Sequence, residues 1–256
     1  MNSKLILHIS DLHFGKINSN VLNSLLTLIN TQKVNCVVVT GDLTQRARSH
    51  QFLAALDFLK KVEAPVLSVP GNHDVPLYNI LQRFFSPFKK YNKYIKPFSP
   101  SIYKDDDMII AGITTNNIYS IKEGKISKKE ILVLEEIFTK DAPQSIRIIA
   151  CHHPVFKKTN NLNIKKLQDR ALTLNPHMIL SGHDHQSSVE FIDLENKKFP
   201  LLVNAGTATS NRTRKEANSV NLIEINFPEF IIKNYIFEES KFELKNTEKF
   251  EMKNSK

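Results

Sequence analysis

The chain has little cysteine, little arginine and no long apolar run. Its 256 residues include two cysteines, Cys36 and Cys151, each inside a predicted buried strand. This excludes a disulfide framework and predicts two core thiols. No stretch approaches the roughly 18 apolar residues of a membrane helix. Because Met1–Lys4 runs straight into a strand, we also expect no signal peptide and predict a cytoplasmic protein.

Positive charge exceeds negative charge, with 35 Lys plus Arg against 26 Asp plus Glu and a net charge of +9. This balance favours an anionic partner such as a nucleotide, nucleic acid or a lipid surface. Alternatively it reflects lysines spread along the chain. Only seven residues are arginine, and four of them lie near predicted site loops: Arg46, Arg48, Arg212 and Arg214. A guanidinium suits phosphate oxygens, so we select Arg46, Arg212 and Arg214 as substrate contacts, although Arg212 and Arg214 could simply face solvent.

The hydrophobic pattern predicts one α/β domain. Hydrophobic residues make up 41% of the chain and charged residues 24%, which is enough for one sizeable core. Strands near 5–9, 36–40 and 65–69 alternate with helical spacing over 18–31 and 49–61, which predicts parallel strands. The remaining chain is mostly strand, with helices near 127–139 and 164–174. We place the domain at 1–240 and expect 241–256 to be a charged tail or an edge hairpin.

Polar side chains follow five predicted strands at the point where each strand ends. The clusters are Asp11-Leu12-His13, Gly41-Asp42, Gly71-Asn72-His73-Asp74, His152-His153-Pro154 and Gly182-His183-Asp184-His185. Open α/β sheets place their sites at the carboxyl ends of strands, so we expect these side chains to converge. Residues i and i+2 of a strand share a face, so Asp11 and His13 can grip one ion together. Carboxylate, imidazole and amide ligands suit Mn, Fe or Zn.

In order, these clusters resemble the signature of the calcineurin-like metallophosphoesterases, and the flanking residues are most similar to the class III cyclic nucleotide phosphodiesterase branch. The resemblance covers about residues 4–214. It implies a four-layer α-β-β-α sandwich of two mixed sheets flanked by helices, and two divalent or mixed-valence metal ions. It also implies ligands for one ion (Asp11, His13, Asp42 and His185) and for the other (Asp42, Asn72, His152 and His183).

A bridging Asp42 fits the chemistry of a two-metal phosphatase. One carboxylate can join cations about 3.5 to 4 Å apart, and the cations make hydroxide available near neutral pH. Two divalent ions, two carboxylates and a bridging hydroxide leave about one positive charge to face a phosphate, and the neutral Asn72 preserves it. The resemblance makes His73 the general acid, and Asp74 is expected to hold its other ring nitrogen. His153 is expected to line the pocket and contact substrate.

The segment 77–104 interleaves aromatic and basic residues, and prolines break its regularity. We predict a cap or wall beside the metals, with Tyr91 and Tyr94 exposed toward the substrate. The open alternatives are a lipid-facing surface and an irregular excursion whose aromatics pack on the core.

The sequence therefore predicts a dinuclear phosphodiester hydrolase acting, through the bridging hydroxide, on a small nucleotide-like substrate such as a cyclic nucleotide. A nucleotide-sugar lipid pyrophosphatase, similar to the UDP-diacylglucosamine hydrolases, is the second enzyme hypothesis and would bring peripheral membrane contact. A nuclease is disfavoured because no additional nucleic-acid domain is visible. A scaffold that has lost catalysis is the non-enzymatic alternative, and the complete ligand set disfavours it. The substrate, the native metals and the oligomeric state are left open.

Overall fold

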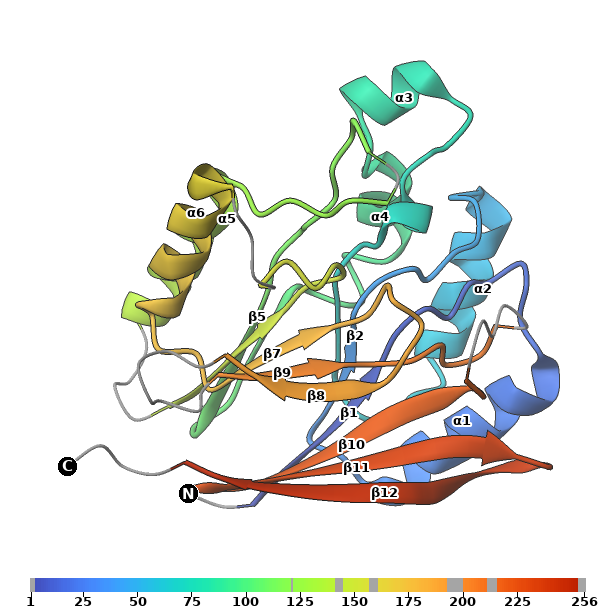
Figure 1. The fold of residues 1–256 in the computed structure, drawn as a ribbon. Helices are drawn as coiled ribbons and strands as arrows, with labels where there is room; N and C mark the ends of the chain where they lie inside the picture. Colours follow the sequence, from blue (N-terminus) through green and yellow to red (C-terminus); the bar gives the residue numbers. More distant parts are fainter. Residues whose placement is uncertain are drawn as a thin grey trace.

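The computed structural model describes residues 3–120, 122–140, 145–156, 161–192, 200–210 and 216–252 (Figure 1). The helices are α1 (Ser19–Gln32), α2 (Ser49–Leu59), the 3-10 turn η1 (Asn72–Asp74), α3 (Ile80–Phe85), α4 (Lys89–Tyr94), α5 (Lys128–Thr139) and α6 (Leu162–Leu172). The strands are β1 (Lys4–Ile9), β2 (Cys36–Val39), β3 (Val66–Ser68), β4 (Ile102–Lys104), β5 (Met108–Gly112), β6 (Ile146–Ala150), β7 (Met178–Ser181), β8 (Ser188–Phe191), β9 (Leu201–Asn204), β10 (Ser219–Asn226), β11 (Glu229–Glu238) and β12 (Lys241–Glu251).

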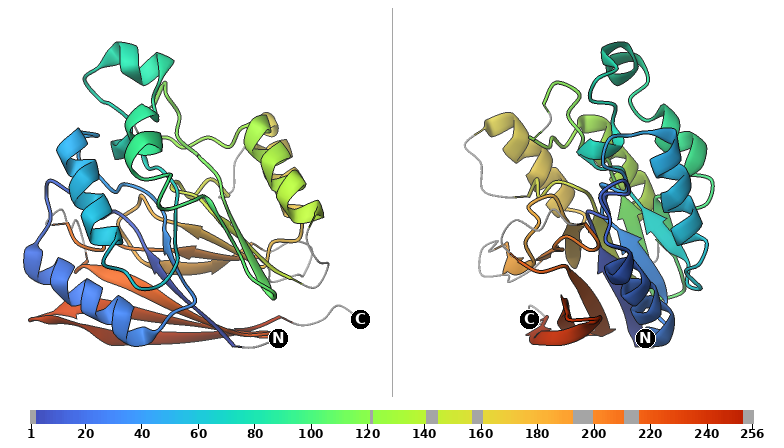
Figure 2. Two further views of the ribbon diagram at one scale, coloured as in Figure 1. Left: turned by 180° about the vertical axis from the view of Figure 1, so that it is seen from behind. Right: turned by 90° about the vertical axis from the view of Figure 1, so that its right-hand side faces the viewer.

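Two six-stranded mixed sheets form the centre of the molecule. The first has the order β12-β11-β10-β1-β2-β3, in which β1, β2 and β3 are parallel. The second has the order β4-β5-β6-β7-β9-β8, in which β5, β6, β7 and β9 are parallel and both edge strands are antiparallel. The predicted α/β architecture of two mixed sheets flanked by helices is confirmed (Figure 2).

The alternation of side chains along the strands explains the four layers. In β1, Ile6 points into the core between the sheets, whereas Leu7 and Ile9 pack with α1 and α2 on the outer face. In β6, Ile148 joins the same central core and Ile149 packs with α5 and α6. A strand buried on both faces needs a continuous apolar sequence, which is what these strands have.

Local signals account for several boundaries. The side chain of Asn18 caps α1 by accepting from the amides of Asn20 and Val21, and Ser127 caps α5 by accepting from the Glu130 amide. The spacing of Ser127 and Glu130 predicts a capping box, but the Glu130 side chain accepts from the amide of Thr114. Both cysteines are buried and free, as predicted.

The segment 77–104 divides into two parts. Helix α4 packs on the core: Tyr91 is 4% exposed and hydrogen bonds Ser68 at 2.7 Å, and Tyr94 stacks on Phe52. The prediction that Tyr91 is exposed toward substrate is therefore wrong, because its ring is buried against β3, while Tyr94 is half-buried against α2. Helix α3 instead projects from the body of the molecule (Figure 1).

The C-terminal segment contributes one long strand. β12 pairs with β11 along its length and forms the edge of the first sheet. The sequence indicates hairpin turns at Phe227-Pro228-Glu229 and at Glu195-Asn196. The first joins β10 to β11, and the second lies outside the described residues. Among the helices of the described ranges, none is long and apolar enough to cross a bilayer.

Candidate metal centre and active site

The carboxyl ends of β1, β2, β3, β6 and β7 meet at one edge of the two sheets, and the structure brings all seven predicted ligands together there. They are Asp11, His13, Asp42, Asn72, His152, His183 and His185. Parallel strands of both sheets point toward this edge, which is why residues 172 positions apart, Asp11 and His183, share a hydrogen bond.

The loops that carry the ligands adopt left-handed backbone conformations. Five of the seven ligands have φ between 50° and 72°: Asp11, His13, Asp42, His183 and His185. A non-glycine residue in this region costs roughly 1–3 kcal/mol and is concentrated at functional sites. Asp11 and His13 lie beyond β1, so the expectation that a strand places them on one face is wrong. Their side chains converge because the backbone turns at each of them.

One group of acceptor atoms gathers around Asp11. Nε2 of His185 lies 3.3 Å and Nε2 of His13 lies 3.5 Å from Oδ1 of Asp11. Nε2 of His13 is also 3.8 Å from Oδ2 of Asp42. Atoms that each bind one transition metal at about 2.0–2.2 Å are separated from one another by about these distances.

A second group gathers around Asn72. Its side-chain oxygen lies 2.9 Å from Nε2 of His152 and 3.0 Å from Nδ1 of His183. Nδ1 of His152 is 2.7 Å from the carbonyl of Thr40, which can only accept, so this nitrogen donates its proton. Nε2 then presents a lone pair to the Asn72 oxygen. Facing acceptors of this kind require a shared cation or proton.

The carboxylate of Asp42 lies between the two groups. Its Oδ2 faces His13 at 3.8 Å, and its Oδ1 faces Nε2 of His152 at 3.5 Å. Oδ1 also accepts the backbone N–H of His73 at 2.7 Å, which fixes the carboxylate. Gly71 makes this approach possible, because a Cβ there would lie 2.1 Å from Oδ1 of Asp42.

Several buried polar atoms at the site lack hydrogen-bond partners in the part of the chain that the structure describes, as expected of metal ligands. Oδ1 of Asp11 and both ring nitrogens of His13 are buried and have no hydrogen-bond partner among the described residues. An unsatisfied buried carboxylate oxygen costs free energy, and a cation at this point would compensate it. Carboxylate, imidazole and amide oxygen donors match Mn, Fe or Zn.

The two site carboxylates resist joint ionisation. Burial raises the pKa of Asp42 well above its ordinary value, and the negative charges of Asp11 and Asp74 raise it further. Burial also opposes ionisation of Asp11, but the neighbouring imidazoles of His13, His152 and His185 outweigh it and lower its pKa. Two cations would stabilise both carboxylates in the charged form.

His73 is positioned by a residue that the sequence did not suggest. Its Nδ1 lies 2.9 Å from the backbone carbonyl of Gln45, so this nitrogen donates. Its ring lies edge-on to that of His13, with 4.9 Å between the centroids. Asp74 does not hold His73 as expected, because its two oxygens accept from the amides of Leu43, Thr44 and Gly71 and from the Thr44 hydroxyl.

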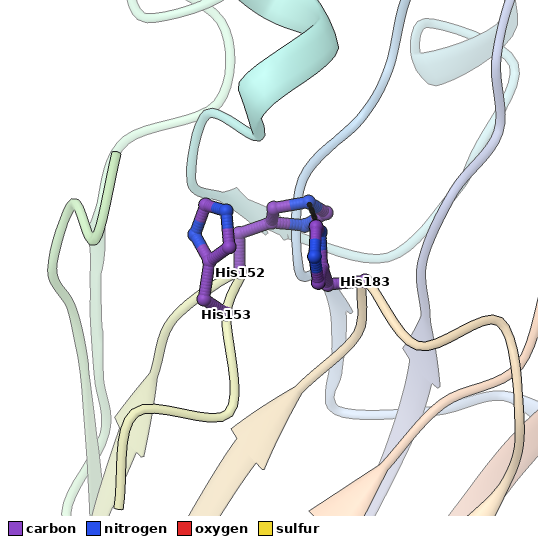
Figure 3. A group of neighbouring side chains, drawn as sticks. All are labelled: His152, His153 and His183. Carbon is purple, nitrogen blue, oxygen red and sulfur yellow. Dashed lines mark hydrogen bonds between the residues drawn. The ribbon is translucent and has the colours of Figure 1, made fainter. Parts of the chain in front are cut away.

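His153 lies beside two of the predicted ligands. Figure 3 shows its imidazole next to those of His152 and His183, and its centroid is 4.4 Å from that of His183. Its Nδ1 is 3.0 Å from Oγ1 of Thr115, while its buried Nε2 has no hydrogen-bond partner in the described ranges. Burial lowers its pKa, and His152 and His183 lower it further.

Of the three arginines predicted to contact substrate, only Arg46 lies within the described residues. The guanidinium of Arg46 lies over the ring of Tyr78 at 5.9 Å from the centroid. Arg212 and Arg214 lie outside the described residues. The loop before them supplies a partner that sequence reasoning missed, because Oγ1 of Thr207 lies 2.8 Å from Nδ1 of His185.

Comparison with known proteins places this site in a family. The family model for calcineurin-like phosphoesterases matches residues 4–187. The chain therefore belongs to the calcineurin-like phosphoesterase family, which confirms the predicted family and its class of enzyme.

Curated relatives are similar at low identity. A 3',5'-cyclic adenosine monophosphate phosphodiesterase from Haemophilus influenzae is 24% identical over 59% of this chain and 54% of its own length. A probable glycerophosphodiester phosphodiesterase from Arcobacter nitrofigilis is 23% identical over 64% of this chain and 62% of its own length. A probable cyclic nucleotide phosphodiesterase from Vesicomyosocius okutanii is 23% identical over 73% of this chain and 81% of its own length. The chain thus covers less than two thirds of the length of the first two relatives.

Solved structures share the fold. A dimetal phosphatase from Danio rerio has a TM-score of 0.63 at 13% identity, covering 98% of this chain and 99% of that one. A purple acid phosphatase from yellow lupin has a TM-score of 0.67 at 10% identity, covering 98% of this chain and 54% of that one.

Proposed function

We propose that this chain is a dinuclear-metal phosphodiesterase that hydrolyses a small nucleotide-like phosphodiester, such as a cyclic nucleotide. The observation that carries the proposal is the Asp42 carboxylate, whose two oxygens face two separate groups of acceptor atoms. The curated relatives named as cyclic nucleotide phosphodiesterases support this substrate class.

The ligands divide into two sets that share Asp42. Asp11, His13, Asp42 and His185 would hold one cation, and Asp42, Asn72, His152 and His183 the other. When bound, the cations supply Lewis-acid charge and an activated water for attack on phosphorus. Manganese, iron and zinc all match the donors. Thr40 and Thr207 fix the ring orientation of His152 and His185 through their second nitrogens.

His73 supplies the proton for the leaving group in this scheme. Because its Nδ1 donates to the carbonyl of Gln45, Nε2 is the atom that can gain and release the catalytic proton. Nε2 of His153 is suited to contact a phosphate oxygen, since it has no partner in the described structure and lies beside the second ligand group. Arg46, Arg212 and Arg214 stay candidate contacts.

The substrate proposal is tested by a turnover screen of Mn-loaded protein, with chelated protein as the control. The panel contains cyclic nucleotides, glycerophosphodiesters, nucleotide diphosphate sugars, lipid-linked nucleotides and an aryl phosphodiester. We expect metal-dependent turnover of the aryl compound and preferred turnover of one cyclic nucleotide. Metal-replete protein that hydrolyses nothing would instead support a scaffold that has lost catalysis.

The exposed apolar side chains of α3 favour a second candidate, a pyrophosphatase of nucleotide-sugar lipids. In the same screen, preference for a lipid-linked nucleotide over every cyclic nucleotide would replace the leading proposal with this one.

A further inference from the structure

Helix α3 lies on the projecting part of the molecule (Figures 1 and 2), and exposed apolar side chains cluster on and beside it. The cluster, termed the α3 knob, consists of Tyr78, Ile80, Leu81, Phe84, Phe85 and Tyr119, which are 76%, 66%, 72%, 44%, 83% and 83% exposed. The surface is continuous across two segments, because the rings of Phe84 and Tyr119 lie 5.8 Å apart. Contiguous exposed apolar surface marks an interaction site.

The burial pattern of α3 is the reverse of that in an ordinary amphipathic helix. Its buried residue is Arg83, which is 8% exposed, while its apolar residues face outward. The guanidinium of Arg83 donates to the carbonyls of Pro76, Ile118 and Ser120. This polar anchor holds the helix to the neighbouring loop, so the outward apolar residues are not needed for folding. They are available for a partner.

The charge around the α3 knob defines the chemistry of that partner. Residues 75–104 contain no Asp or Glu, and the segment that follows α3 carries several lysines on and just after α4. Lys89, Lys93 and Lys96 are exposed. The partner must offer negative charge together with an apolar phase.

We infer that the α3 knob is a docking surface for an anionic phospholipid membrane. Leu81 and Phe85 would enter the interface between headgroups and acyl chains, and the lysines would pair with anionic headgroups. A second copy fits less well, since two such surfaces would face each other with like charge. Nucleic acid would leave Ile80, Leu81 and Phe85 without an apolar environment.

Membrane docking would hold the active-site edge close to the lipid surface. The segment that leads into α3 begins directly after η1, which carries Asn72 and His73. Tyr78 of the knob also contacts Arg46 from the loop after β2. The inference concerns where the protein works, and it does not depend on which phosphodiester is hydrolysed.

The chain contains no tryptophan, so one introduced tryptophan reports on the knob alone. Phe85→Trp places the probe at the knob, and Leu244→Trp places a control probe on β12, where Leu244 is 52% exposed. Vesicles of phosphatidylcholine with about 30% phosphatidylglycerol should shift the emission of F85W to shorter wavelength, and brominated acyl chains should quench it. L244W should show neither effect. Unchanged F85W emission at low salt would overturn the inference.

Flotation with the same vesicles tests the residues directly. Leu81→Ser combined with Phe85→Ser should weaken binding at least about tenfold, because two buried apolar side chains are lost. Leu132→Ser, at a residue 48% exposed on α5, is the matched control and should bind as the unmodified protein does. Lys89→Glu with Lys93→Glu should weaken binding in a salt-dependent way. Hydrolysis of a soluble aryl phosphodiester should be unchanged in every variant.

Two results would contradict the inference. Equal binding by the L81S/F85S variant and the unmodified protein would remove the knob from membrane contact. A dimer in solution that only L81S/F85S dissociates, without vesicle binding by the unmodified protein, would assign the surface to self-association.

Discussion

Nε2 of His152 lies 2.9 Å from the side-chain oxygen of Asn72, and neither atom has a proton for the other. The proton of His152 is on Nδ1, where it is donated to the carbonyl of Thr40. Burial lowers the pKa of His152 to about 3, so the ring is neutral at pH 7. Two lone pairs at this distance repel each other unless one cation binds both atoms. This contact is the most direct sign of a metal-binding site in the chain.

Asp42→Asn is expected to separate stability from metal binding. Burial is the main cause that raises the pKa of Asp42 in the folded protein above its value in the unfolded chain. The unfolded chain therefore ionises first, and the metal-free folded protein loses stability as pH rises above about 3.9. At pH 7 the metal-free variant should therefore unfold at a higher temperature than the metal-free unmodified protein. Calorimetry with and without a chelator measures this. The chelator should lower Tm strongly in the unmodified protein and little in the variant.

Equal Tm values for the two metal-free proteins would contradict the electrostatic account. The variant retains an oxygen that can accept the amide of His73, so loss of that hydrogen bond is not a competing explanation.

His73→Ala should retain the metals and lose about 10²- to 10⁴-fold in kcat, the usual contribution of a general acid. The loss should shrink for a nitrophenyl diester, whose leaving group needs no proton. Elemental analysis and kcat for two leaving groups test this, with the exposed His50 replaced by Ala as the control. A variant purified without metal would show that His73 supports the ligands instead.

Asp74→Asn should behave differently from His73→Ala. The Asp74 carboxylate fastens the loop after β2 to the turn after β3, through backbone amides of both. An amide group cannot accept at both atoms, so at least one buried donor loses its partner at a cost of about 1–3 kcal/mol. Urea unfolding should detect this loss, and metal content should fall with it. The exposed Asp57→Asn should leave both unchanged.

We expect His177 to contribute to the loss of stability of the fold at acid pH. Burial, together with the positive charge of Arg147, lowers its pKa to about 4. The unfolded chain takes up a proton near pH 6.5 and the folded chain does not, so this contribution to stability is present above pH 6.5 and is lost as pH falls toward 4. His177→Asn keeps an acceptor for the amide of Arg147 and removes the titration.

Unfolding free energies at pH 7.5 and pH 5 test this. The unmodified protein should lose on the order of 1–2 kcal/mol more than His177→Asn between the two values. His50→Asn, at an exposed position, should follow the unmodified protein. Identical losses in all three proteins would remove His177 from the acid response.

The sequence predicted the helices and strands better than it predicted side-chain environments. Apolar runs such as Val37–Val39 indicate strands buried on both faces, and the structure has them. The assignment to four layers came from the family resemblance. The aromatic segment was misread because composition does not reveal direction: Tyr91 of α4 faces the core, whereas Phe85 of α3 faces solvent.

The chemistry of the site was predictable, but the backbone that presents it was not. Strand ends predicted the convergence of Asp11, Asp42 and His152, which the structure brings within one group. The left-handed turns at Asp11 and Asp42 left no sequence signal, since glycine is the residue usually expected there. The partner of His73 was equally invisible, because it is a backbone carbonyl, that of Gln45.

The number and positions of bound metals test the central claim most directly. Crystals of Mn-loaded protein, measured for anomalous scattering together with elemental analysis of active protein, would locate each ion. We predict two ions about 3.5–4 Å apart, both contacted by the carboxylate of Asp42. One ion in fully active protein, or two ions that share no Asp42 oxygen, would contradict the account.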